Sequence, residues 1–147
     1  MYKLDPKPFI VVCYLLLLFV TAPSLAYSNQ CPPKLYNQAE KAMASLDSWQ
    51  KVYQFYSRFR VCDDGGNADD LTESIVRLLV DRWKEVSIFG HLAHKNPGFK
   101  AFILLHIDST ADTDDLYKIQ MLSSQHCPQK YLSLCKEIKA SVHTALQ

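Results

Sequence analysis

Four cysteines, spread between positions 31 and 135, limit most strongly what this chain can fold into. Cys31 and Cys62 lie in the first half, and Cys127 and Cys135 are eight positions apart near the end. The fifth cysteine, Cys13, lies in the N-terminal apolar run, and its removal with a signal peptide would leave an even number, which predicts two disulfides in a compartment that oxidises thiols. Whether the chain reaches such a compartment depends on its first residues.

The first 26 residues have the three regions of a cleaved signal peptide. Lys3 and Lys7 precede an uncharged apolar run over residues 10–20, and Ser24 and Ala26 occupy the two small positions that a signal peptidase requires. The run is shorter than the roughly 20 residues that span a bilayer. We therefore predict a signal peptide over residues 1–26, cleaved after Ala26, and a periplasmic protein. A retained membrane anchor is the alternative, and stable membrane insertion after cleavage is not expected.

The mature part, residues 27–147, is predicted to be a single domain. Its 121 residues are enough for one sizeable core, and no flexible linker divides them. It carries 14 basic and 14 acidic side chains, since Lys3, Lys7 and Asp5 leave with the signal peptide. A neutral chain without a basic run is not typical of a nucleic-acid or lipid-surface binder. A protein partner is expected, and a homodimer stays open.

The cysteine spacings favour one disulfide connectivity among three. Cys127 and Cys135 would lie roughly 12 Å apart along a continuous helix, too far to bridge. Pro128 favours a loop that folds back over the start of the last helix. We prefer Cys31 with Cys62 and Cys127 with Cys135. Zinc ligation is disfavoured, because these spacings are not those of a zinc site.

Helical periodicity runs through the mature part, with apolar residues recurring three and four positions apart. The fifth predicted helix contains an apolar run over residues 100–107 that could alternatively form a buried strand, but no partner strand is evident. The sequence therefore predicts an all-α bundle of about six to seven short helices. Their predicted positions are 33–45, from Asp47 or Ser48 to 60–62, from Asp69 or Asp70 onward, 86–95, from Pro97 onward, from Thr113 onward, and 131–145.

The densest polar segment is predicted to be an acidic, glycine-flexible loop after Cys62. The order of its side chains does not match a calcium-binding EF-hand loop. Its simplest interpretation is a turn followed by a negatively charged helix start. A loop anchored by a disulfide would also lose less entropy on entering a partner's groove. The predicted partner-binding residues are Asp63, Asp64, Asn67, Asp69 and Asp70.

No catalytic or metal motif stands out, so we expect a protein that is not an enzyme and needs no cofactor. His91 and His94 are three apart but lack a third ligand in a zinc pattern. His106 and Asp108 are two apart and would point to different sides of a helix. The cysteines are assigned to disulfides, and no Gly-x-Ser-x-Gly motif occurs.

Several short motifs carry a resemblance. They are Cys62-Asp-Asp-Gly65, the helix from Ser74 to Trp83, His106-Ile-Asp108, Asp114-Asp-Leu116, and Cys127-Pro128 with Leu134-Cys135. With them the chain resembles a group of small exported proteobacterial helical proteins, over most of its mature part. The resemblance supplies no catalytic residues.

In size, export and fold class, the chain also resembles periplasmic immunity proteins. Such proteins protect a bacterium from cell-wall-degrading effectors, and the likeness is an analogy of type. It implies a domain that occludes a cognate toxin, such as a peptidoglycan amidase, with the segment from Asp63 to Asp70 near the contact. The alternatives are a metal-binding or hydrolytic periplasmic protein that uses His91, His94 and His106, and a structural or adaptor module of the envelope.

Overall fold

The computed structural model describes residues 31–147, so the predicted signal peptide and its cleavage site lie outside the described residues. The described part is all-α with two disulfides, as predicted. It contains seven α-helices and three 3-10 turns: α1 (Pro33–Met43), α2 (Trp49–Phe59), η1 (Arg60–Cys62), α3 (Gly65–Asp81), η2 (Trp83–Glu85), α4 (Val86–Lys95), α5 (Pro97–Leu105), α6 (Thr113–Gln125), η3 (Gln129–Tyr131) and α7 (Leu132–Ala145).

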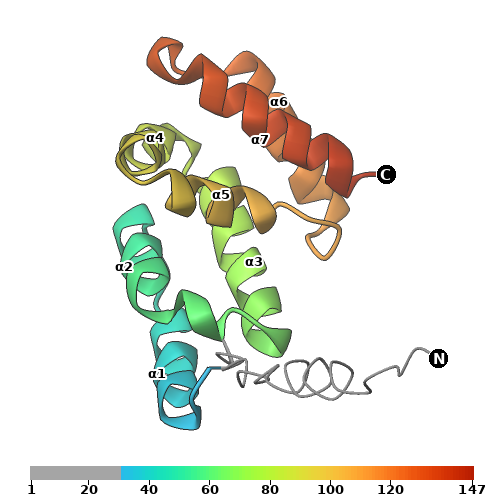
Figure 1. The fold of residues 1–147 in the computed structure, drawn as a ribbon. Coiled ribbons are helices and arrows are strands. Elements are labelled where there is room, and N and C mark those ends of the chain that lie inside the picture. Colours follow the sequence, from blue (N-terminus) through green and yellow to red (C-terminus); the bar gives the residue numbers. More distant parts are fainter. Residues whose placement is uncertain (1–30) are drawn as a thin grey trace, which may run out of the picture.

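The central element is α3, the longest helix of the described part. It contacts α1 near one end of the molecule and α6 near the other, and α6 packs against α7 as an antiparallel pair (Figure 1). Leu71, Ile75 and Leu79 recur every four residues along α3 and are fully buried. Burial of each such side chain contributes about 1.5–3 kcal/mol. The wide apolar stripe of α3 is the reason it can be covered on several sides.

An aromatic cluster joins α2, α4 and α5. The rings of Trp49 and Phe89 stack at 4.8 Å between centroids, and Phe99 meets Phe89 edge to face at 5.9 Å. Tyr53 packs edge to face on the same Phe99 ring at 5.0 Å. Phe55 of α2 is also buried, whereas Tyr53 is half-buried.

Most helix starts follow their local sequence signals. Asn96 caps α5 by accepting a hydrogen bond from the Phe99 backbone, and Pro97 occupies the first position of the helix. Asp112 caps α6 in the same way, because its carboxylate accepts hydrogen bonds from the backbone N–H groups of Asp114 and Asp115. The run over residues 100–107 is helical as far as Leu105, so the strand alternative is excluded.

One predicted boundary is wrong. The Gly65-Gly66 pair was expected to break the chain, with α3 starting after Asp69 or Asp70, but α3 already begins at Gly65. Gly65 has a φ of +50°, which glycine adopts without a Cβ penalty. The buried Asn67 side chain donates to the Cys62 carbonyl at 3.1 Å and holds the first turn in place. These contacts outweigh the low helix propensity of glycine.

Both preferred disulfides are present, Cys31–Cys62 and Cys127–Cys135. The first ties the start of the described chain to η1. The second disulfide closes a short loop that contains η3. This is the loop that the sequence predicts to fold back over the start of the last helix. In the chain-entropy account, a bridge between residues 31 apart stabilises the fold by roughly 3.5 kcal/mol.

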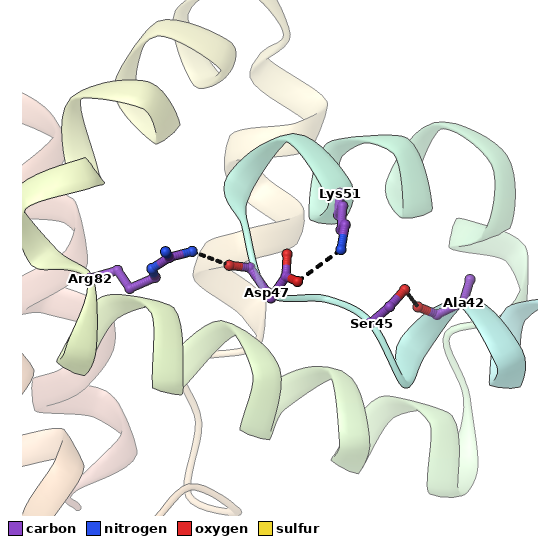
Figure 2. A network of polar contacts seen from close by, with 5 residues as sticks. All are labelled: Ala42, Ser45, Asp47, Lys51 and Arg82. Carbon is purple, nitrogen blue, oxygen red and sulfur yellow. Dashed lines mark hydrogen bonds and ion pairs between the residues drawn. The ribbon is translucent and has the colours of Figure 1, made fainter.

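Polar contacts fix the turn between α1 and α2 (Figure 2). Ser45 donates to the Ala42 carbonyl, and Arg82 donates to the Asp47 carbonyl, linking the turn to the end of α3. The Lys51 ammonium donates to the Asp47 carboxylate at 2.8 Å. This hydrogen bond is the main reason that the pKa of Asp47 lies below its ordinary value of 3.8.

We expect Lys51→Ala to raise the pKa of Asp47 towards 3.8, because the main cause of the lowering is removed. A carboxyl with a lowered folded-state pKa stabilises the fold above its unfolded pKa and loses that contribution as pH falls through the lowered value. An NMR titration of the Asp47 carboxyl carbon measures the shift. Lys41→Ala, an exposed change on α1, serves as the control and leaves the titration unchanged. A midpoint at or above 3.8 in the unmodified protein would contradict the assignment.

Candidate functional site

The charged residues of the chain are strongly segregated although their totals balance. Residues 63–73 and 108–115 contain nine of the 15 acidic side chains and none of the 16 basic ones. The first segment forms the start of α3, and the second leads into α6. Because α3 packs against α6, the two acidic segments lie on one part of the surface.

A groove of about 620 Å³ runs between α3 and α6. Its floor contains Thr72, Val76, Val80 and Ala111. Arg77 and Lys118 are the two bases of its lining. We call it the α3–α6 groove, and its six acidic residues are Asp69, Asp70, Glu73, Asp81, Asp112 and Asp115.

The two bases leave much of this negative charge uncompensated. Arg77 lies 3.7 Å from Glu73, and Lys118 lies 3.9 Å from Asp81. Both pairs are solvent-exposed, and such pairs contribute little to stability. A concave surface lined by one sign of charge focuses its field and concentrates oppositely charged ligands. The groove therefore favours a basic partner.

Of the five predicted partner-binding residues, three are suitably placed. Asp64, Asp69 and Asp70 are exposed, and the last two line the α3–α6 groove. Asp63 and Asn67 are turned inward, where they hold the domain's own structure. The segment is the start of α3, which agrees with its simplest interpretation as a turn and a negatively charged helix start and replaces the glycine-flexible loop.

The inward-facing Asp63 belongs to a buried network of three polar residues. Its carboxylate lies 3.1 Å from Nε2 of His106, and Nδ1 of the same imidazole lies 3.0 Å from the Thr72 hydroxyl. The Asp63 side chain is 13% exposed and His106 is 5% exposed. This network connects the residue after η1, the helix α3 and the end of α5. We call it the His106 clamp.

A hydroxyl, an imidazole and a carboxylate in this order also occur in nucleophilic triads. Thr72, however, is only 3% exposed and lies within α3, where the backbone N–H groups are used in helical hydrogen bonds. A substrate carbonyl would find neither access to this hydroxyl nor donors for its developing negative charge. The geometry favours a structural connection.

The other histidines considered for metal binding lie elsewhere. His91 and His94 are exposed on α4 and line a cavity that His106 does not reach. Within residues 31–147, no group of three or more His, Cys, Asp or Glu side chains is arranged to hold a metal ion. The metal-binding alternative required these histidines to converge, and the fold separates them.

Sequence reasoning missed four of the six acidic residues of the groove. The sequence interpretation placed Asp115 only at a helix start and assigned no role to Asp112, which caps the same helix. Glu73 and Asp81 carried no motif. The detectable signal was the absence of any base from residues 63–73 and 108–115, which net charge conceals.

No protein-family model, curated protein or solved structure matches this chain. Within residues 31–147, no helix is long and apolar enough to cross a membrane.

We expect Thr72→Val to lower the free energy of unfolding by about 1–3 kcal/mol, because it leaves Nδ1 of the buried His106 without its partner. Urea unfolding monitored by circular dichroism measures the change. Thr144→Val is the matched control, since Thr144 is exposed on α7 and bonds only within its helix. The control is expected to stay within about 0.5 kcal/mol of the unmodified protein. Equal effects of the two substitutions would show that the clamp contributes no stability.

Proposed function

We propose that this chain is a periplasmic, non-enzymatic binding protein of the immunity type, which neutralises a cognate antibacterial effector by covering part of its surface. The observation that carries the proposal is the α3–α6 groove, where six carboxylates face two bases on a rigid helical frame. The partner's contact surface is then basic. Since the effector would act on the cell wall, the inhibitor has to be exported with it, as the first 26 residues predict.

The structure of the groove supports binding more than chemistry. Carboxylates that face one another across a groove repel, and a partner's Lys or Arg side chains would relieve this repulsion. Disulfide Cys31–Cys62 and the His106 clamp fix the α3 side of the groove before binding. A preformed surface loses less conformational entropy on association than a mobile loop. The alternatives, a hydrolytic protein and an envelope adaptor, have no comparable feature among residues 31–147.

The test is binding of mature residues 27–147, under non-reducing conditions, to the exported products of adjacent reading frames and to periplasmic extract. We expect one basic hydrolase to be retained and its activity to be inhibited. Asp69→Lys should weaken binding several-fold and Asp69→Lys/Asp70→Lys by about tenfold or more, chiefly through a slower association rate that depends on salt. Surface plasmon resonance at two ionic strengths separates the association and dissociation rates.

Glu40→Lys is the matched control for Asp69→Lys. It makes the same change of net charge at an exposed position on α1, outside the groove. Two negative outcomes have different meanings. Absence of any retained and inhibited hydrolase would overturn the proposed function, whereas inhibition that is equally strong in Asp69→Lys/Asp70→Lys and Glu40→Lys would remove the α3–α6 groove as the contact surface.

A further inference from the structure

A second cavity is lined by residues other than those of the α3–α6 groove, and it carries two lysines, two histidines and one glutamate. Residues 86–105 and 128–147, which form α4, α5, η3 and α7, contain five lysines and one acidic residue, Glu137. These elements enclose a groove of about 490 Å³, within the usual range for ligand pockets. We call it the Tyr131 groove. It shares no lining residue with the α3–α6 groove.

The floor of the Tyr131 groove is apolar and its rim is basic. Gly90, Ala93, Pro97 and Leu134 form the apolar part. The rim contains His91, His94, Lys100 and Lys130. The Lys100 ammonium lies 2.7 Å from the Glu137 carboxylate and forms an ion pair with it. The Lys130 ammonium lies over the Tyr131 ring, 5.6 Å from the ring centroid.

The wall formed by Tyr131 is fixed on two sides. Tyr131 lies inside the short loop closed by the Cys127–Cys135 disulfide. The Tyr131 ring packs closely on Gly90, and a Cβ atom at position 90 would lie only 2.5 Å from the ring. No other residue type fits beneath the ring without displacing it. The cavity is therefore a preformed feature of the fold rather than a gap between mobile side chains.

We infer that the Tyr131 groove is a second docking site, whose occupant is an acidic protein segment with one large apolar anchor side chain. The apolar floor accepts the anchor, because it offers no polar group that an apolar side chain would leave unpaired. Because Lys100 is already paired with Glu137, the Lys130 ammonium and the imidazole N–H groups of the rim are the donors offered to the acidic residues that flank the anchor, and lysine recognition of carboxylates is charge-assisted. This site differs in partner chemistry from the α3–α6 groove and does not depend on the proposed function.

The direct test uses three short fluorescein-labelled peptides: one Trp between runs of Glu, the same peptide with Ala in place of Trp, and one Trp between runs of Lys. Fluorescence polarisation with mature residues 27–147 measures binding, and NMR shift changes locate it. We expect the Glu-Trp peptide to bind and to perturb Gly90, Tyr131 and Leu134. The other two peptides should bind at least about tenfold more weakly, since each lacks one half of the recognition.

Two variants examine the site itself. Ser133→Trp places a bulky side chain in the groove at an exposed position and should abolish binding of the Glu-Trp peptide. Lys130→Glu should weaken it about three- to tenfold. Lys136→Glu, at an exposed position outside the groove, is the matched control for charge and should leave binding unchanged.

Three outcomes would overturn the inference. The first is no binding of the Glu-Trp peptide at millimolar protein concentration. The second is binding that Ser133→Trp and Lys130→Glu reduce no more than Lys136→Glu does. The third is retention of the chain by phosphatidylglycerol vesicles, sensitive to Ser133→Trp, without any peptide binding, which would assign this surface to an anionic membrane instead.

Discussion

The arrangement of the whole domain depends on the contacts around Cys62 and Asp63. Cys62 is fully buried and joined to Cys31, its carbonyl accepts from Asn67, and the next residue, Asp63, holds His106. One dipeptide thus connects the start of the described chain, the first turn of α3 and the end of α5. A buried imidazole that bonds on both sides has one favourable orientation, so this junction specifies how three distant segments meet. The segment after His106 then leads directly to α6, and in this way the clamp positions both sides of the acidic groove.

The sequence predicted the fold well where the signals are local. Pro97, the segment from Thr113 to Asp115 and the apolar periodicity located α5, α6 and α7 closely, because helix-start signals and helical faces act within a few residues. The start of α3 was predicted wrongly for the opposite reason. Gly65 and Gly66 disfavour a helix, and the preference is reversed by the hydrogen bond from Asn67 to Cys62 and by the long-range contact of Asp63 with His106.

The site was harder to predict than the fold for a related reason. Asp69 and Asp70 were recognised from their density in the sequence, but their neighbours in space, Asp112 and Asp115, lie more than 40 positions away. No pattern of spacing along the chain shows that α3 packs against α6. Equal totals of acidic and basic residues in the mature part also suggested a neutral surface, whereas the fold gathers six carboxylates around one groove. Net charge is an argument about the whole molecule and says nothing about its separate faces.

Each disulfide holds a residue that supports one of the two grooves, which gives the two bridges a role beyond stabilising a domain that already has a sizeable core. Cys31–Cys62 fixes the residue before Asp63, and through the clamp it supports the α3 side of the acidic groove. Cys127–Cys135 closes the loop that presents Tyr131 against Gly90. A domain of about this size folds without covalent help when its core is well packed. The bridges therefore contribute rigidity at two surfaces as well as stability, and rigidity at a surface lowers the entropy lost when a partner binds.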